Sequence, residues 1–398
     1  MIKPADMVAR LKAADWLQRE ETQTMLKLLG GEEGKTRAVG GIVRDTLLGR
    51  DLAPADIDFA TALLPHEVAI RAERAGISVH PTGIEHGTVT LRLDGLVAEV
   101  TTLREDVETD GRRALVQFGT DWVRDAERRD FTLNALYVGM DGDLFDPLGG
   151  LGDCLAGRVR FIGDPARRIE EDRLRVYRFF RFSASHGGEK FDQAGLEACR
   201  DASDRLDGLS AERVGHELRR MLALARVATT LKAMVEADIL ALSGETIRLL
   251  HSYERRARRP DFSARLAIII AETGINRLKS RWRLSNDEVA AAEVILTVSQ
   301  LVRDYKLNEA AYRHPAALAD GVEVAAILAD WTEAGKSAVL DQLQGLSVPR
   351  FPVSGGDLIK LGLRPGRALG AELDRLEQLW IESGFALDRA ALLATLKV

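Results

Sequence analysis

The sequence predicts an α+β fold, in which a small head with a mixed β-sheet and flanking helices precedes a long helical part. Two patterns predict it. Between Thr36 and Leu103, short stretches alternate apolar and polar residues, as strands do. After Gly163 the apolar residues recur every three or four positions, which is the spacing of helices. With 398 residues, the chain is long enough for two to four domains.

The elements are assigned in chain order from their local patterns. Residues 1–29 predict one or two helices, and residues 65–75 predict a helix within the strand-rich part. Residues 104–120 are polar, charged and interrupted by glycine, so we expect a long mobile loop there. The segment AERRDFTLNALYVG then returns to packed structure. The five strands expected before the loop are TRAV, ADIDFAT, ISVH, GTVTLRL and LVAEVTTL.

These changes of pattern predict a small α/β head followed by a long α-helical body. Turn signals support breaks in the helical part, for example Pro352-Val353-Ser354-Gly355-Gly356. A long helical body of this kind is suited to binding RNA or protein.

Composition limits the classes of function. A hydrophobic fraction of 46% and a charged fraction of 29% are typical of soluble proteins. No apolar run of signal-peptide or membrane-spanning length occurs, so we expect a cytoplasmic protein with no membrane partner. Two cysteines, Cys154 and Cys199, indicate neither a disulfide framework nor a zinc site. A net charge of −6 argues against unselective coating of nucleic acid.

One stretch departs from this acidic balance. Between His251 and Leu284 there are nine Lys and Arg residues against three acidic ones. Such a stretch is either an electrostatic footprint for a phosphate backbone or a solvated helix face. The sequence alone leaves both interpretations open.

The most informative stretch is AVGGIVRDTLLGRDLAPADIDFAT, residues 38–61. On a strand, Asp56 and Asp58 project from one face, while Ile57 and Phe59 point to the core. Two carboxylates held so close repel each other unless a cation lies between them, and such oxygen ligands suit Mg²⁺. A solvated Asp-x-Asp is the alternative. The apolar strand and the preceding glycine turn, where backbone N–H groups can approach a triphosphate, favour the metal site.

A third carboxylate, Glu99, alternates with Val97 and Thr101 on a strand expected to neighbour the two aspartates. It either takes part in the metal site as a catalytic residue or is a surface charge. The segment GGEEGKT, by contrast, is one residue too short for a phosphate-binding P-loop and follows a helix pattern in place of a strand. A P-loop ATPase is therefore excluded.

The string EDRLRVYRFFRF (171–182) is the second informative feature. On a continuous helix, Asp172, Arg175 and Arg178 lie near one face. A surface ladder of ion pairs is one interpretation. The other is base selection, because aspartate accepts hydrogen bonds and arginine donates them. Cytosine and adenine present an amino donor beside a ring-nitrogen acceptor, whereas uracil and guanine present the reverse. An Asp–Arg pair would therefore accept C and A and reject U and G.

These segments together resemble the class II tRNA nucleotidyltransferase/poly(A) polymerase family, within the polymerase β nucleotidyltransferase superfamily. Four motifs occur in the family's order: GGIVRDTLLGR with ADIDFAT, RRDFTLNAL (128–136), DPLGGLGDC (146–154) and EDRLRVYRFFRF. The tail segment SGGDLIKLGLRPGRALGAELDRL is also similar to the C-terminal helices of these enzymes. The resemblance covers nearly the whole chain. It implies four domains: a nucleotidyltransferase head (1–150), a neck with the base-recognition helix (151–225), a helical body (226–350) and a helical tail (351–398).

The resemblance implies a role for each matching residue. Asp56 and Asp58 would bind two metal ions. The residues implied to hold the triphosphate are Gly40, Gly41 and Arg44, with Asp45 bracing their loop. Those implied to address the ribose and orient the nucleotide are Arg129 and Asp130, supported by Asn134. Those implied to read the base are Asp172 and Arg175, with Glu171 holding them and Arg178 assisting.

The implied activity is template-independent addition of C, C and A to the 3′ end of tRNA from CTP and ATP, with Mg²⁺ as cofactor and pyrophosphate released. The body and tail would grip the acceptor stem and upper arm of tRNA, and residues 104–120 would correspond to the loop that switches C to A addition. The alternatives are a poly(A) polymerase and an enzyme that adds only C or only A. A catalytically dead RNA-binding protein is disfavoured, because Asp56 and Asp58 are both present. The oligomeric state stays open.

Overall fold

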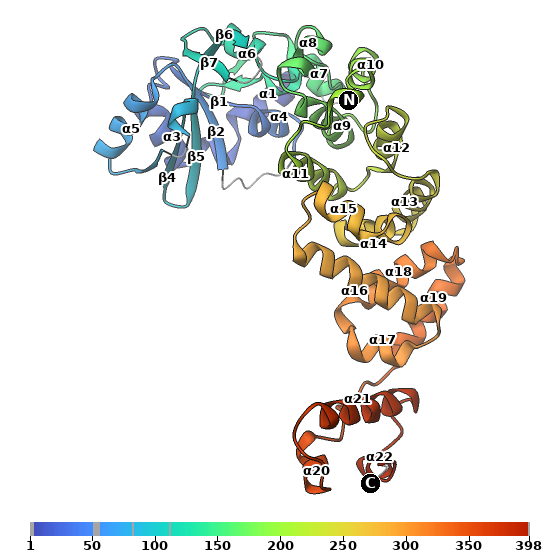
Figure 1. Cartoon of the computed structure of the whole chain (residues 1–398). Coiled ribbons are helices and arrows are strands. Elements are labelled where there is room, and N and C mark those ends of the chain that lie inside the picture. Colours follow the sequence, from blue (N-terminus) through green and yellow to red (C-terminus); the bar gives the residue numbers. More distant parts are fainter. Residues whose placement is uncertain (1–3, 51–55, 82, 111–112, 397–398) are drawn as a thin grey trace. The chain divides into compact units, whose positions relative to one another are not determined.

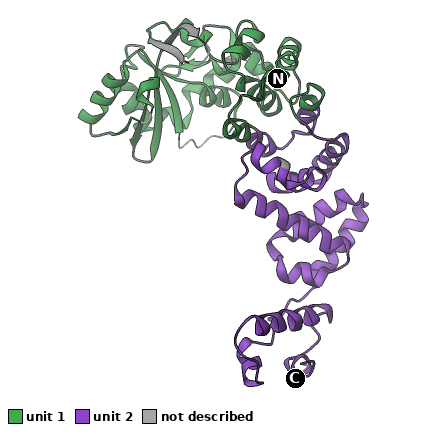
Figure 2. Cartoon of the chain, viewed as in Figure 1, with its two compact units in different colours: residues 1–217, 233–240 green, residues 218–232, 241–398 purple. Residues whose placement is uncertain are grey.

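The computed structural model describes residues 4–50, 56–81, 83–110 and 113–396, which form two compact units (Figure 2). Unit 1 consists of residues 1–217 and 233–240, and unit 2 of residues 218–232 and 241–398. The sheet lies in unit 1 and unit 2 is helical, so the predicted α+β fold is confirmed. The division into four domains stays a prediction.

The head opens with three short helices, where the sequence predicted one or two. They are α1 (Pro4–Lys12), α2 (Asp15–Gln18) and α3 (Glu20–Leu28). Extended backbone at Ala14 and Arg19 separates them. The apolar spacing runs across these two breaks, since Trp16 and Leu17 are buried in the short middle helix. The pattern therefore did not reveal where each helix ends.

A seven-stranded mixed sheet forms the centre of the head (Figure 1), in the order β3-β4-β5-β2-β1-β8-β9. Strand β2 pairs with β5 in parallel, and the other strand pairs of this sheet are antiparallel. All five predicted strands are present. The strands are β1 (Thr36–Val39), β2 (Asp56–Thr61), β3 (Ser78–His80), β4 (Thr88–Leu93), β5 (Leu96–Thr102), β8 (Tyr137–Val138) and β9 (Leu144–Phe145).

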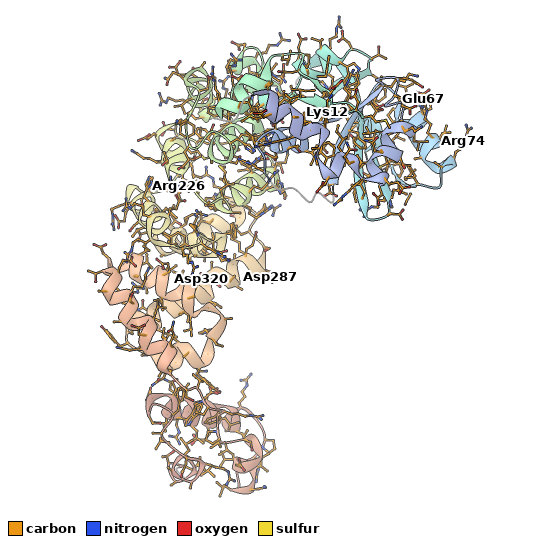
Figure 3. All side chains as sticks on the ribbon, turned by 180° about the vertical axis from the view of Figure 1, so that it is seen from behind. Lys12, Glu67, Arg74, Arg226, Asp287 and Asp320 are labelled. Atoms are coloured by element: carbon orange, nitrogen blue, oxygen red, sulfur yellow. The ribbon has the colours of Figure 1, made fainter. Side chains whose placement is uncertain are left out.

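Helix α5 (Pro65–Arg74) shows why the predicted helix forms where it does. Proline is favoured in the first turn of a helix, and Glu67 accepts the backbone N–H of Leu64 at 3.0 Å. Glu67 and Arg74, both labelled in Figure 3, lie in the first and last turns, where their charges complement the helix dipole. Val68 and Ala72 are buried on the opposite side.

Residues 104–110 and 113–118 form two paired strands, so the prediction of a long loop was wrong. Strands β6 (Arg104–Asp110) and β7 (Arg113–Phe118) pair antiparallel, with an irregularity between Val107 and Thr109. The charged composition concealed an alternation in RALVQF and an Asp-Gly pair, which is typical of hairpin turns. Residues 111 and 112 lie outside the described residues.

Helices and short connections complete unit 1. A cluster of aromatic rings, with centroids 4.9 to 6.3 Å apart, packs α9 against the segment after α6: Phe131, Phe161, Phe179, Phe180, Phe182 and Phe191. The elements are α4 (Gly41–Leu47), η1 (Ile84–His86), α6 (Trp122–Glu127), η2 (Thr132–Asn134), α7 (Gly150–Ala156), α8 (Pro165–Glu171), α9 (Leu174–Ser185), α10 (Gln193–Asp201), η3 (Ser203–Arg205) and α11 (Ala211–Leu222), whose last turn belongs to unit 2.

Unit 2 is helical, as predicted. Among the described residues, apolar cores of this unit lie around Val298 and Val322 and around Leu376 and Trp380. Within the described residues, no helix is both long and apolar enough to cross a membrane. The helices are α12 (Ala228–Glu236, shared with unit 1), α13 (Gly244–Arg256), α14 (Phe262–Thr273), α15 (Ile275–Arg281), α16 (Asn286–Arg303), α17 (Leu307–Arg313), η4 (Pro315–Ala317), α18 (Leu318–Leu328), α19 (Glu333–Gly345), α20 (Gly355–Lys360), α21 (Arg367–Glu382) and α22 (Arg389–Leu393).

Candidate active site

The two aspartates lie on the solvent face of β2. Asp56 and Asp58 are exposed, whereas Ile57 and Phe59 between and after them are buried, as the alternation predicted. The parallel register sets Asp58 directly beside Glu99 of β5, so three carboxylates share one face of the sheet.

The electrostatics of Asp58 reflect this crowding. Partial desolvation by the neighbouring atoms raises the pKa of Asp58, and the negative charges of Glu99 and Asp56 raise it further, while Arg129 opposes them. An excess of negative charge on oxygen ligands fits a hard divalent cation. Among the described residues, no group of three or more His, Cys, Asp or Glu side chains is arranged to hold a metal ion. The candidate ligands are therefore Asp56 and Asp58, and a role for Glu99 stays a prediction.

The predicted glycine turn joins β1 to α4. Gly40 has φ +76°, a left-handed conformation that side chains other than glycine rarely adopt, and α4 begins at Gly41. A Cβ at Gly40 would meet nothing closer than 3.9 Å, so the backbone conformation, rather than space, requires glycine here.

Arg44 follows one turn later and is buried. Its guanidinium donates to Asp45 through Nε (3.0 Å) and Nη2 (2.8 Å), and to Asn134 Oδ1 through Nη1 (2.6 Å). Asp45 also contacts His186 Nε2 at 2.9 Å. Although burial opposes it, the hydrogen bonds from His186 and Arg44 hold the pKa of Asp45 well below its usual range. Burial in turn lowers the pKa of His186 to about 4.

Asp130 continues this network toward α9. Its Oδ1 accepts from the Phe131 N–H (2.9 Å) and from Asn134 Nδ2 (3.0 Å), and its Oδ2 accepts from Arg178 Nε (2.7 Å). Although burial opposes ionisation, Arg178 and Asn134 hold the pKa of Asp130 below its ordinary value. A chain of hydrogen bonds thus joins the predicted triphosphate, ribose and base segments: His186, Asp45, Arg44, Asn134, Asp130 and Arg178.

Arg129 is held by two residues that the sequence analysis missed. Its Nη2 lies 3.1 Å from Asp125 Oδ2, and its Nε donates to the Tyr137 hydroxyl at 3.0 Å. Tyr137 in turn donates to Asp125, which is buried, at 2.9 Å. The pairing fixes Arg129 on the side of the sheet where its charge acts on Asp58.

The segment 171–182 differs from the prediction, because Asp172 is not on a helix. Helix α8 ends at Glu171, Asp172 adopts an extended conformation (φ −149°, ψ 103°), and α9 begins at Leu174. Asp172 Oδ1 accepts the Leu174 N–H at 3.1 Å, which satisfies a donor at the start of α9. The continuous apolar spacing of the sequence masked this break.

Arg175 lies in the first turn of α9, beyond the break. Its Nη1 donates to Glu171 Oε2 at 2.8 Å and to the Arg168 carbonyl at 2.7 Å, and its Nη2 donates to the Arg128 carbonyl at 3.2 Å. Glu171 therefore contacts Arg175, the residue it is implied to hold. The break sets the predicted acceptor and donor, Asp172 and Arg175, on two adjoining segments.

Helix α11 supplies two further residues that the sequence analysis missed. Arg213 Nη2 donates to Asp172 Oδ2 at 2.8 Å. Glu217, which is buried, pairs with Arg181 and lies 3.8 Å from Arg178. The only local signal was an Arg and a Glu four residues apart, which is common on exposed helices.

A cavity of about 700 Å³ borders this region but is not the predicted site. Arg168 and Glu171 line it together with Arg160 and Asp192, whereas neither Asp58 nor Asp172 does. It lies beside the segment predicted to read the base and outside the carboxylate face.

The arginine-rich stretch of unit 2, residues 251–284, contains arginines held in ion pairs as well as exposed arginines. Arg265 is fully buried and pairs with Glu254 at 2.9 Å, and Arg256 pairs with Glu333 at 2.7 Å. Arg255, Arg258 and Arg259 are exposed. The sequence count therefore overstates the positive charge that a ligand can meet.

Comparison with known proteins relates the chain to enzymes that act on RNA ends. A family model described as "Poly A polymerase head domain" matches residues 36–160, and one described as "Probable RNA and SrmB- binding site of polymerase A" matches residues 190–242. The chain is 34% identical over 374 residues to "CCA tRNA nucleotidyltransferase 1, mitochondrial" of Danio rerio, covering 90% of this chain and 86% of the relative. It is 32% identical over 371 residues to a "CCA-adding enzyme" of Limosilactobacillus fermentum, covering 89% and 90%.

Solved structures give the same relationship. The Bacillus stearothermophilus CCA-adding enzyme in complex with CTP superposes with a TM-score of 0.75 at 26% identity, over 92% of this chain and 93% of that one. The Thermotoga maritima CCA-adding enzyme complexed with tRNA_CCA has a TM-score of 0.67 at 17% identity, over 97% of both chains, which shows a shared fold.

Proposed function

Because the chain belongs to the family of CCA-adding tRNA nucleotidyltransferases, we propose that it adds C, C and A to the 3′ end of tRNA from CTP and ATP without a template. Relatives at 32% to 34% identity, aligned over most of both chains, are named "CCA tRNA nucleotidyltransferase 1, mitochondrial" and "CCA-adding enzyme". The observation that carries the proposal is the pair Asp56 and Asp58 on one open sheet face, in the same unit as the Asp172–Arg175 segment. A poly(A) polymerase or a partial enzyme is not favoured, since these relatives are CCA-adding enzymes.

Asp56 and Asp58 would hold the divalent cations, and we propose Mg²⁺. When bound, such ions lower the pKa of the attacking 3′-hydroxyl and neutralise charge on the leaving pyrophosphate. The tRNA 3′-oxygen attacks the α-phosphorus, the bond from this phosphorus to the bridging oxygen breaks, and pyrophosphate leaves. The hydroxyl proton passes to solvent or to a nearby base.

The residues of the chain then act mainly by positioning and charge. The turn at Gly40 and Gly41 brings backbone close to the triphosphate, and Arg44, braced by Asp45, adds positive charge there. Arg129 lies near enough to Asp58 to lower its pKa, so its charge reaches the carboxylate face. Asp130 and Asn134 support the ribose segment through their mutual hydrogen bond.

Base choice would use Asp172 and Arg175 in place of a template strand. Asp172 can accept a hydrogen bond from the amino group of C or A, and Arg175 can donate to the ring nitrogen beside it. A pyrimidine or purine with the reverse pattern leaves both groups unsatisfied. Arg178, which ties Asp130 to α9, keeps the base and ribose segments in register.

Unit 2 would bind the acceptor stem and upper arm of tRNA. The exposed Arg255, Arg258 and Arg259 offer positive charge to a phosphate backbone. Their contribution should appear as salt-dependent affinity for tRNA, with no effect on which nucleotide is added.

The test is nucleotide addition by the purified chain to a tRNA that ends at the discriminator base, with MgCl₂ and CTP, ATP or both. The proposal predicts growth by three nucleotides with both, and by C alone with CTP. A long ladder with ATP alone would establish a poly(A) polymerase, and extension that stops after C would establish a partial enzyme.

A further inference from the structure

We propose that Arg213 of α11 is a specificity-determining positioning residue, which fixes the orientation of the Asp172 carboxylate and so enforces rejection of UTP and GTP. The inference deepens the proposed function and rests on it, because it concerns selection at the same base site. The proposal rests on the hydrogen bond from Arg213 Nη2 to Asp172 Oδ2, at 2.8 Å.

Asp172 needs such a partner because of its place in the chain. It lies in the extended link between α8 and α9, outside both helices. Its Oδ1 is held by the Leu174 N–H at 3.1 Å, and its Oδ2 is held by Arg213. The two bonds fix both oxygens, and with 34% of its side chain exposed the carboxylate still has lone pairs open to a ligand.

Arg213 is itself held in place from the same helix. Glu217 lies one turn later on α11, and therefore on the same side as Arg213. Its buried carboxylate pairs with Arg181 and approaches Arg178, both on α9. This ion pair docks α11 against α9, and the docking sets where Arg213 reaches Asp172.

The chemistry of selection follows from a fixed acceptor. A carboxylate held at both oxygens offers only acceptors, so the O4 of uracil or the O6 of guanine would face a second acceptor with no donor between them. Without Arg213, the carboxylate can turn away from the ligand, and the repulsion is relieved. Loss of one hydrogen bond to a charged group should therefore reduce discrimination by about tenfold or more.

The experiment measures single-turnover kcat/KM for CTP and UTP on a tRNA ending at the discriminator base. Arg213→Gln is expected to lower the CTP:UTP ratio by about tenfold or more, and Arg213→Lys to recover part of it. The matched control is Arg205→Gln, because Arg205 has similar exposure (46% against 52%) and lies 3.9 Å from Glu170 in a surface ion pair. The control ratio should not change.

A second background separates positioning from a general structural effect. In Asp172→Ala, the further change Arg213→Gln should leave the CTP:UTP ratio unaltered, because the residue that Arg213 orients is gone. An unchanged ratio in Arg213→Gln alone, or an equal drop in both backgrounds, would overturn the inference. Failure of the wild-type chain to add C or A at all would instead refute the proposed function.

Discussion

Replacing Asp130 by Asn should strongly destabilise unit 1 while leaving unit 2 unaffected. The buried carboxylate accepts from the Phe131 N–H and Asn134 on one oxygen, and from Arg178 Nε at 2.7 Å and Nη2 at 2.6 Å on the other. An asparagine that keeps the first two bonds turns its NH₂ group toward the guanidinium, so donor faces donor.

The magnitude follows from the environment of the pair. Removing one partner of a buried ion pair costs about 3–5 kcal/mol. Because 31% of the Arg178 side chain is exposed, water can partly solvate it after the change, and we expect the lower end, about 3 kcal/mol. The lowered pKa of Asp130 gives the sign of the pH effect: its stabilisation is present above its unfolded pKa, near 3.8, and is lost as pH falls through the folded value. The difference between wild type and variant should therefore shrink in strong acid.

The assay is a urea titration followed by hydrogen-exchange mass spectrometry, which reports residues 1–217 separately from residues 241–398. The control is Asp143→Asn. Asp143 also pairs with a cation, Lys12 (labelled in Figure 3), at 2.7 Å, but both side chains are more than half exposed. No measurable change is expected in the control. Equal stabilities for the two variants, or destabilisation shared by both units, would refute the reasoning.

Three other predictions concern separate features. Arg175→Ala should relax discrimination against UTP and GTP, measured as the ratio of kcat/KM values; unchanged selectivity would make the first turn of α9 only structural. Burial lowers the pKa of His186 to about 4, so the unfolded chain protonates this residue at a higher pH than the folded chain does. The stability of unit 1 should therefore fall as the pH is lowered from about 6.5 to about 4. His186→Gln should flatten that part of a pH series of urea midpoints, and an unaltered slope would contradict it. Arg265→Leu should destabilise unit 2 by about 3 kcal/mol, because Glu254 loses its cation and keeps only the backbone N–H groups of Val227 and Ala228 as partners; a stability equal to that of wild type would count against the burial argument.

The parts of the fold that were predicted correctly are those that the local alternation of apolar and polar residues indicates. The alternation around Asp58 fixed which side chains face solvent, and the same alternation around Glu99 led to the strand that lies beside it. The orientation of functional side chains within one strand can be predicted in this way, because successive side chains of a strand point to opposite faces of the sheet.

Features that depend on residues far away in the chain could not be predicted from the sequence. The break at Asp172 interrupts a helical pattern that the sequence carries through without a gap, and it is stabilised by Arg213, 41 residues away. The contact of Tyr137 with Arg129 and Asp125 exists only once β8 has joined the sheet, whereas Asp125 and Arg129 are a local pair four residues apart. The paired strands at 104–110 and 113–118 were hidden because charged composition outweighed their alternation.

The most direct test of the account is single-turnover addition of C to tRNA by Asp56→Ala and Asp58→Ala, alongside wild type. Both aspartates are exposed, so their removal should leave the urea midpoint unchanged. The control is Asp207→Ala, an exposed aspartate outside the site. Loss of metal-assisted charge stabilisation worth several kcal/mol predicts a rate lower by roughly 10³-fold or more in both site variants, with the control at the wild-type rate. A rate within tenfold of wild type in either folded variant would contradict the assignment of this carboxylate pair as the catalytic centre.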